Sequence, residues 1–196
     1  MAREIEFVFD VGSPTAYLAW TQLPALKLKT GSEIKLTPVL LGGLFKASGN
    51  ASPTDSAAKT AYIAKDCARI ARRLGVIFKL NPHFPVNTMI IMRAIVGAQR
   101  AGQLDPLLTA AFHAMWVGGQ KLDDPVILEH ISEQADIRVA KLASWIGDDS
   151  VKAQLRTNTD HAAKRGAFGA PTFFVGDEMF FGQDRMDWVA DAATAR

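Results

Sequence analysis

Cysteine is almost absent from this sequence, since Cys67 is the only one among 196 residues. A single cysteine excludes both an intramolecular disulfide bond and a cysteine-rich metal site. The 4 histidines show no spacing typical of metal ligands, so no bound metal is expected. Cys67 lies in a predicted amphipathic helix, away from any helix N-terminus. This position favours a structural role over that of a nucleophile.

Long apolar segments and an excess of one charge are also missing. No apolar run approaches the about 20 residues that a transmembrane helix needs. The 22 basic and 20 acidic residues are scattered, so neither a membrane nor nucleic acid is expected as a partner. Charged residues interrupt the first ten positions, which argues against a secretory leader. We therefore expect a reducing, cytoplasmic location, with a mitochondrial or peroxisomal one as the less favoured alternative.

The first 40 residues predict a βαβ unit. Residues 4–10 are rich in apolar and β-branched side chains, as in a buried strand. An amphipathic stretch at 17–28 predicts a helix that Gly31 and Ser32 end, and residues 33–40 predict a second strand. This order predicts a parallel strand pair with a right-handed crossover.

A long helical block follows this unit. Residues 41–55, rich in Gly, Ser, Asn and Pro, predict a loop that is too long to be a simple connector. Beyond it the apolar spacing is helical almost throughout, with Gly or Asp between the segments. Helices are predicted at 57–74, 87–101, 106–117, 125–135, 140–146 and 151–164.

Strand patterns return near the end, at 172–175 and 178–181, before a last helix from Asp184. The order βαβ, helical block, ββα predicts an α/β, thioredoxin-like fold with an inserted all-helical domain. We expect the thioredoxin-like domain to comprise residues 1–55 and 165–196, and the helical insertion to comprise residues 56–164.

Two short segments far apart in the chain carry the clearest chemical signal. Ser13 and Pro14 follow the first predicted strand, and Ala170 and Pro171 precede a later one. A helix N-terminus has unpaired N–H groups and partial positive charge, which stabilise a thiolate or carboxylate placed there. Together the segments resemble a thioredoxin-type active site without its cysteines, in which Pro171 is expected to be cis. Taken alone, Ser13 also fits a helix cap, and Pro171 a turn.

Four motifs occur in one order along the whole chain. They are Asp10-Val11-Gly12-Ser13-Pro14; Leu40-Leu41-Gly42-Gly43-Leu44-Phe45-Lys46 with Gly49-Asn50; Lys59-Thr60-Ala61-Tyr62 with Lys65-Asp66; and Gly169-Ala170-Pro171-Thr172 followed by Gly182-Gln183-Asp184-Arg185. This pattern resembles the kappa-class glutathione transferases and the glutathione-dependent 2-hydroxychromene-2-carboxylate isomerases. The resemblance implies a fold related to the bacterial disulfide oxidoreductases, glutathione as cofactor and a homodimer.

The resemblance also implies roles in binding glutathione. Ser13 is implied to meet the sulfur atom, where its hydroxyl would favour the thiolate. Ala170, before Pro171, is implied to pair with the peptide as an added strand does. Asn50 and Lys59 are implied to contact glutathione, with Lys59 near the glycyl carboxylate.

The segment Gln183-Asp184-Arg185 lies where a predicted strand passes to the last helix. Gln183 and Asp184 offer acceptors and backbone donors that suit the γ-glutamyl end of glutathione. Arg185 can pair with that carboxylate or with Asp184 itself. As a capping sequence the segment needs only Asp184, and the resemblance favours the binding role for Gln183 and Asp184.

The second substrate is implied to be a small aromatic keto acid or hemiketal. Lys46, Asp55 and Phe84 are the residues implied to hold it, with Lys46 balancing its carboxylate. His83 is either a proton shuttle or a solvated loop residue. Gly12 is smaller than the residue that often precedes the serine in this family, so a more open turn is expected there.

The function expected from these features is glutathione-dependent isomerisation. The thiolate would add transiently to 2-hydroxychromene-2-carboxylate and leave trans-o-hydroxybenzylidenepyruvate, with glutathione recovered. One alternative is a kappa-type transferase that releases a glutathione adduct. Another is a non-catalytic thioredoxin-like protein that binds peptides at the edge beside Pro171. Disulfide exchange is excluded because the site has no cysteine.

Overall fold

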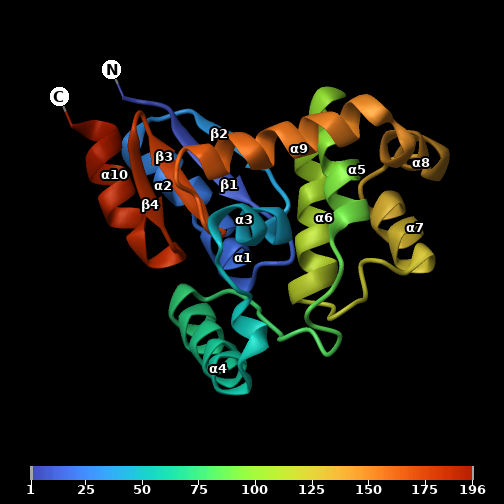
Figure 1. The fold of residues 1–196 in the computed structure, drawn as a ribbon, viewed down its shortest axis with the longest axis horizontal. Coiled ribbons are helices and arrows are strands. Elements are labelled where there is room, and N and C mark those ends of the chain that lie inside the picture. The colour runs from blue at the N-terminus through green and yellow to red at the C-terminus, as the bar shows by residue number, and fades with distance from the viewer. Residues whose placement is uncertain (1, 196) are drawn as a thin grey trace.

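A four-stranded sheet forms the centre of the computed structural model, which describes residues 2–195 (Figure 1). The central strand β1 (Ile5–Phe9) pairs in parallel with β2 (Ile34–Pro38) and antiparallel with β3 (Thr172–Val175). Strand β4 (Glu178–Phe181) pairs antiparallel with β3 at the far edge. The parallel pair belongs to a βαβ unit, and the antiparallel pair of β3 and β4 belongs to a ββα unit. These units are the two halves of the predicted thioredoxin-like fold.

Helices α4 to α9 form the insertion between β2 and β3. Figure 1 shows α5 to α8 grouped together at one side of the sheet and α4 lying apart from them. The helices are α1 (Pro14–Trp20), α2 (Leu23–Thr30), α3 (Leu41–Ser48), α4 (Ala57–Leu74), α5 (Met89–Arg100), α6 (Leu104–Trp116), α7 (Pro125–Gln134), α8 (Val139–Gly147), α9 (Asp149–Lys164) and α10 (Met186–Thr194), with 3₁₀ turns η1 (Pro53–Asp55) and η2 (Gln183–Arg185).

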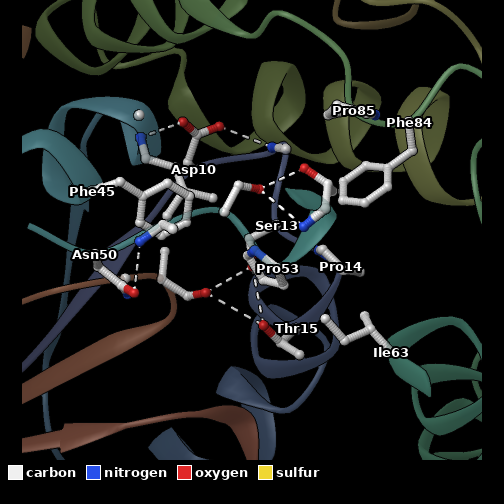
Figure 2. Close-up of a pocket in the computed structure, with 18 of the residues that line it drawn as sticks. Asp10, Ser13, Pro14, Thr15, Phe45, Asn50, Pro53, Ile63, Phe84 and Pro85 are labelled. Carbon is white, nitrogen blue, oxygen red and sulfur yellow. Dashed lines mark hydrogen bonds between the residues drawn. The ribbon is translucent and has the colours of Figure 1, made fainter. Parts of the chain in front are cut away.

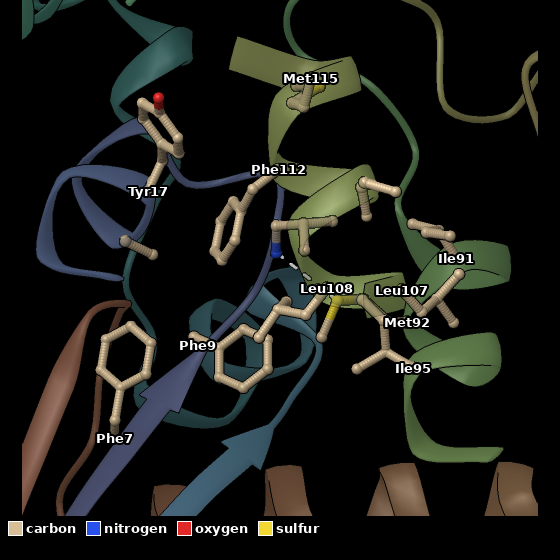
Figure 3. Packing of buried hydrophobic residues seen from close by; sticks show 14 of the residues in the cluster. Phe7, Phe9, Tyr17, Ile91, Met92, Ile95, Leu107, Leu108, Phe112 and Met115 are labelled. Atoms are coloured by element: carbon tan, nitrogen blue, oxygen red, sulfur yellow. Dashed lines mark hydrogen bonds between the residues drawn. The ribbon is translucent and has the colours of Figure 1, made fainter. Parts of the chain in front are cut away.

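Side chains of β1 alternate between two apolar clusters, because successive residues of a strand point to opposite faces. Phe7 and Phe9 belong to the larger cluster, where the Phe9 ring lies 6.1 Å from that of Phe112 in α6 (Figure 3). Val8 points the other way, into a smaller cluster with Leu44 of α3 and part of α9. The larger cluster runs from the sheet into α5 and α6, so one core joins the sheet to the insertion.

The single helix predicted at 17–28 is wrong, because the chain forms α1 and α2 in this region. Pro24 has no N–H group to donate to the carbonyl of Trp20, and its ring would clash with that carbonyl in a continuous helix. Helix α1 accordingly ends at Trp20, and Pro24 lies in the first turn of α2.

The loop predicted at 41–55 is also wrong, because α3 and η1 occupy most of it. Glycines lower helix propensity, and Gly42 and Gly43 both lie in α3. Tertiary contacts outweigh this preference, since Leu44 is fully buried in the smaller cluster. The other predicted helices and strands agree with the structure to within two residues at each end, apart from the last helix, which is preceded by η2.

Candidate functional site

Ser13 joins the two segments that the sequence singled out. It is the N-cap of α1, and its Oγ accepts a hydrogen bond from Ala16 N–H at 3.1 Å. The same hydroxyl donates to the carbonyl oxygen of Ala170 at 2.8 Å. The peptide bond between Ala170 and Pro171 is cis, as predicted. Ser13 therefore caps the helix and also contacts the proline turn, with only 3% of its surface exposed.

Asp10 holds the turn that carries Ser13. Its Oδ1 accepts from Gly12 N–H at 2.9 Å, and its Oδ2 accepts from Leu41 N–H at 2.8 Å (Figure 2). Leu41 is the first residue of α3, whose own N-cap, Leu40, makes no side-chain hydrogen bond. Burial raises the pKa of the Asp10 carboxyl, while hydrogen bonds from Leu41, Gly12 and Thr88 act in the opposite direction. One buried carboxylate thus ties the end of β1 to the start of α3.

The insertion also fixes this turn. Trp116 of α6 donates its indole N–H to the carbonyl of Val11 at 2.8 Å. A Cβ on Gly12 would lie only 2.9 Å from Cγ2 of Thr88. The expectation that Gly12 leaves the turn more open is therefore wrong, because Thr88 fills the space that the missing side chain provides.

A cavity of about 650 Å³ opens beside Ser13. In the view of Figure 2, Phe45 and Phe84 lie on either side of Ser13. Of the described residues that line the cavity, the charged ones are Asp10 and Lys59. The apolar part of the wall comprises Pro14, Leu41, Phe45, Ile63, Phe84, Pro85, Val86 and Phe181, with further lining from Pro53 and Ala170. The cavity can thus hold a small ligand that has an apolar part and lies beside a helix N-terminus.

Five of the predicted site residues line this cavity. Asn50, at its edge, donates from its side chain to the carbonyl of Phe168 at 3.1 Å. Lys59 lies in the first turn of α4 and lines the cavity. The five are Ser13, Asn50, Lys59, Phe84 and Ala170, so segments far apart in sequence meet here.

The predicted γ-glutamyl segment lies next to the cavity without lining it. Gly182 N–H donates to the carbonyl of Pro171 at 3.0 Å, which places η2 beside the proline turn. Arg185 donates to Asp184 at 2.6 Å, so its charge is directed at that carboxylate. Gln183 is half-buried, whereas Asp184 and Arg185 are exposed.

The other predicted positions lie farther from the cavity wall. Lys46 is exposed in the last turn of α3, and Asp55 is exposed in η1. His83 is exposed in the loop before the cis peptide bond between Phe84 and Pro85. None of these three lines the cavity within the described residues 2–195, and their roles stay predictions.

Thr15, Thr88 and Phe181 contribute to the site and were not found from the sequence. Thr15 Oγ1 lies 3.1 Å from the hydroxyl of Ser13 and donates to the Ala170 carbonyl at 3.3 Å. A hydroxyl two residues after Ser13, in the same helical turn, was a usable signal. Thr88 and Phe181 reach the cavity only through long-range packing, which no local pattern indicates.

Cys67 is buried in α4, outside this site. Burial and the neighbouring charge of Asp66 raise the pKa of its thiol to about 12, so the reactive thiolate is disfavoured. Among residues 2–195, no group of three or more His, Cys, Asp and Glu side chains is placed to hold a metal ion. In the same part of the chain, no helix combines the length and apolar character needed to cross a membrane.

Comparison with known proteins finds relatives that match almost the whole chain. The family model of the DSBA-like thioredoxin domain matches residues 4–193. A 2-hydroxychromene-2-carboxylate isomerase of Sphingobium xenophagum is 29% identical over 191 residues, covering 96% of this chain and 97% of that protein. Glutathione S-transferase kappa 1 of Rattus norvegicus is 28% identical, covering 96% of this chain and 89% of the relative.

Solved structures also resemble this chain over almost its whole length. A 2-hydroxychromene-2-carboxylate isomerase superposes with a TM-score of 0.84 at 26% identity, covering 96% of this chain and 93% of the other. The oxidoreductase DsbA of Xylella fastidiosa superposes with a TM-score of 0.64 at 15% identity, covering 100% of this chain and 86% of the other, a likeness of fold alone. The chain therefore belongs to the family of the DSBA-like thioredoxin domain.

Proposed function

We propose that this chain is a glutathione-dependent enzyme that isomerises 2-hydroxychromene-2-carboxylate or a similar aromatic keto acid or hemiketal. The observation that carries the proposal is the position of Ser13, which lies at the N-terminus of α1, against the Ala170 carbonyl and in the wall of the cavity. A helix N-terminus and a hydroxyl donor both favour a thiolate over a thiol. Similarity to isomerases and kappa-class transferases along almost the whole chain supports the same proposal.

The residues around the cavity fit glutathione. A volume of about 650 Å³ lies within the range of small-molecule sites, about 300–1,000 Å³. We assign the peptide backbone to the edge at Ala170 and Pro171, and the glycyl end to Asn50 and Lys59 at the mouth of the cavity. Lys59 supplies the positive charge that the glycyl carboxylate needs.

The γ-glutamyl end would lie toward Gln183 and Asp184, beside the proline turn. Its ammonium group needs an anionic partner, which Asp184 offers, and its carboxylate needs donors, which the start of η2 offers. Arg185 already pairs with Asp184, so we assign it to orienting that carboxylate.

When bound, glutathione supplies a thiolate nucleophile, whose transient addition makes a locked double bond of the substrate free to rotate. Ser13 donates a hydrogen bond that keeps the sulfur deprotonated at neutral pH. The aromatic wall formed by Phe45 and Phe84 excludes water and orients a flat ring beside Ser13.

A kappa-type transferase is the second candidate function, and one observation favours it. The charged lining residues are Asp10 and Lys59, and Lys59 is already assigned to glutathione. The carboxylate of an aromatic keto acid would then have no cation of its own in the cavity wall. An uncharged aromatic electrophile fits such a wall better than a carboxylate does.

Two parallel incubations distinguish these functions. The protein is mixed with glutathione and either 2-hydroxychromene-2-carboxylate (the chromene acid) or an uncharged aromatic electrophile, and the aromatic product and the remaining glutathione are measured in each. An isomerase converts the chromene acid while all glutathione is recovered, whereas a transferase consumes glutathione in proportion to the adduct formed with the uncharged electrophile. Equal binding of glutathione and unrelated tripeptides, with no turnover, would instead indicate a peptide-binding protein and would contradict the proposal.

The change Ser13→Ala tests the proposed role of the hydroxyl. The variant keeps the helix N-terminus, Ala170 and Asn50, so glutathione should still bind while its thiol pKa rises. Losing one charge-assisted hydrogen bond of about 1.5–3 kcal/mol raises that pKa by roughly one to two units. The thiolate absorbance of bound glutathione, followed against pH, measures this shift.

The matched control is Asp124→Ala, which removes the N-cap of α7. Asp124 also precedes a proline and also accepts a backbone hydrogen bond, from Val126 N–H at 2.9 Å. This control should lose about 1 kcal/mol of stability with no change in the thiol pKa. If Ser13→Ala behaves in the same way, with full activity retained, Ser13 is only a helix cap.

A further inference from the structure

Two hydroxyl groups converge on one carbonyl oxygen at the site. Ser13 donates to the Ala170 oxygen at 2.8 Å, and Thr15 donates to the same oxygen at 3.3 Å (Figure 2). The two hydroxyl oxygens are 3.1 Å apart, close enough for one to donate to the other. Ser13, Thr15 and Ala170 therefore form a closed triangle of polar groups, with Ser13 and Ala170 almost fully buried.

The proton of Ser13 cannot serve two acceptors at once. A serine hydroxyl has one donor hydrogen, and here it is directed at the Ala170 carbonyl. If Ser13 donates instead to a sulfur atom, that carbonyl loses its shorter hydrogen bond. Were the Thr15 hydroxyl absent as well, this buried carbonyl would lose both hydroxyl donors, and that free-energy cost would oppose the turn of the Ser13 hydroxyl toward a ligand.

Thr15 is placed to remove this cost. Its hydroxyl already lies within hydrogen-bond range of the Ala170 oxygen, and the first turn of α1 fixes its backbone. We propose that Thr15 is a positioning residue that takes over the Ala170 carbonyl and so frees the proton of Ser13 for the glutathione sulfur. The inference rests on the proposed function, because it deepens the role of Ser13 there.

The geometry also predicts that Thr15 acts only through Ser13. Thr15 has no assigned contact with the sulfur, and its effect comes from the acceptor that it shares with Ser13. Its removal should therefore matter only while the hydroxyl of Ser13 is present. This dependence separates a positioning role from a second direct donor and from a structural role.

The experiment compares Thr15→Val and Thr15→Ser, each alone and combined with Ser13→Ala. The thiol pKa of bound glutathione is read from thiolate absorbance against pH, and affinity is read by calorimetric titration. Thr15→Val should raise the pKa by about half to one unit, with affinity kept within about twofold. Thr15→Ser should restore the original pKa, and Thr15→Val should add no shift in the Ser13→Ala background.

Each other outcome overturns a distinct claim. An unchanged pKa in Thr15→Val, with glutathione bound, overturns the inference and leaves the proposed function in place. An equal shift with and without the Ser13 hydroxyl also overturns it, because Thr15 would then donate to the sulfur directly. Failure of the unmodified protein to bind glutathione overturns both the inference and the proposed function. If circular dichroism shows that Thr15→Val is misfolded, Thr15→Ala removes the same hydroxyl and is measured in its place.

Discussion

The two lysines assigned to carboxylates differ in where their side chains lie. Lys59 projects from the first turn of α4 and lines the cavity. Lys46 is exposed in the last turn of α3 and does not line the cavity. Coulomb attraction in water weakens quickly with distance and salt, so only a lysine at the cavity can hold a ligand there.

We expect Lys59→Ala to weaken glutathione binding by about two- to fivefold, because an exposed ion pair contributes about 0.2–1 kcal/mol. The loss should shrink as salt is raised. Calorimetric titration at low and high salt measures both effects. Lys46→Ala is the matched control and should leave this affinity unchanged.

The turnover of the chromene acid is also measured in Lys59→Ala and Lys46→Ala. A loss of turnover in Lys46→Ala with unchanged glutathione affinity would support the sequence-based assignment of Lys46 to the second substrate. Equal losses of glutathione affinity in both variants would contradict the assignment of the glycyl end to Lys59 alone.

At the scale of elements, the helices of the insertion approach one another closely where a side chain is missing. A Cβ on Gly97 of α5 would overlap the Cβ and Cγ atoms of Trp145 in α8. Trp145 and the backbone of α5 therefore pack so closely only because Gly97 has no side chain.

Gly97→Ala should therefore destabilise the protein, although alanine favours a helix by about 1 kcal/mol over glycine. Overpacking of about 1–3 kcal/mol or more outweighs that gain. Gly147→Ala in α8 is the control, since nothing lies within 4 Å of the added Cβ there. Urea unfolding should show a lower midpoint for Gly97→Ala alone, and a midpoint at or above the original for both would disprove the packing argument.

At the scale of the whole molecule, one charged cluster joins the end of the insertion to the sheet. Glu6 of β1 accepts hydrogen bonds from Thr37 of β2 and from Arg165, the residue after α9. Arg165 also donates to the carbonyl of Gly176 at 3.0 Å and lies 3.7 Å from the centre of the Phe174 ring. The predicted domain boundary at 164/165 remains a prediction, but Arg165 holds the chain where it returns to the sheet.

This cluster makes stability depend on pH. Burial alone would raise the pKa of the Glu6 carboxyl, but hydrogen bonds from Thr37 and Arg165 and the charge of Lys35 outweigh it and hold the pKa below its usual value. A lowered pKa in the folded state means that Glu6 stabilises the fold above the ordinary glutamate pKa of about 4.3. This contribution is lost as the pH falls through the pKa of the folded state.

Glu6→Gln should reduce the free energy of unfolding by about 1–3 kcal/mol at pH 7. The difference from the unmodified protein should shrink as the pH falls from the ordinary glutamate pKa of about 4.3 through the lower pKa of the folded state, where Glu6 becomes protonated. Denaturant unfolding across this pH range measures it. Glu33→Gln is the control, because its pair with Lys27 is exposed, and a loss as large in this variant would argue against the buried cluster.

Local signals in the sequence determined the order of the elements, and the resemblance to a thioredoxin-type active site implied the meeting of Ser13 with Ala170 and Pro171. Apolar periodicity, glycine and proline act over a few residues, so they predicted most helices and strands closely. The motif that Ser13 and Pro14 form is likewise local, whereas its pairing with the turn at Pro171 was implied by the resemblance to a thioredoxin-type active site. The sequence therefore predicted the fold class and, through the resemblance, the contact between Ser13 and the turn at Ala170 and Pro171.

Only the tertiary structure decided what depends on contacts between distant segments. Helix α3 contains two glycines and forms because Leu44 is buried and Asp10 accepts its first N–H. The shared acceptor of Ser13 and Thr15, and the choice of Lys59 over Lys46 at the cavity, are equally non-local. The physical reason is that burial and hydrogen-bond partners are set by packing across the whole chain, and packing overrides local propensity wherever the two disagree.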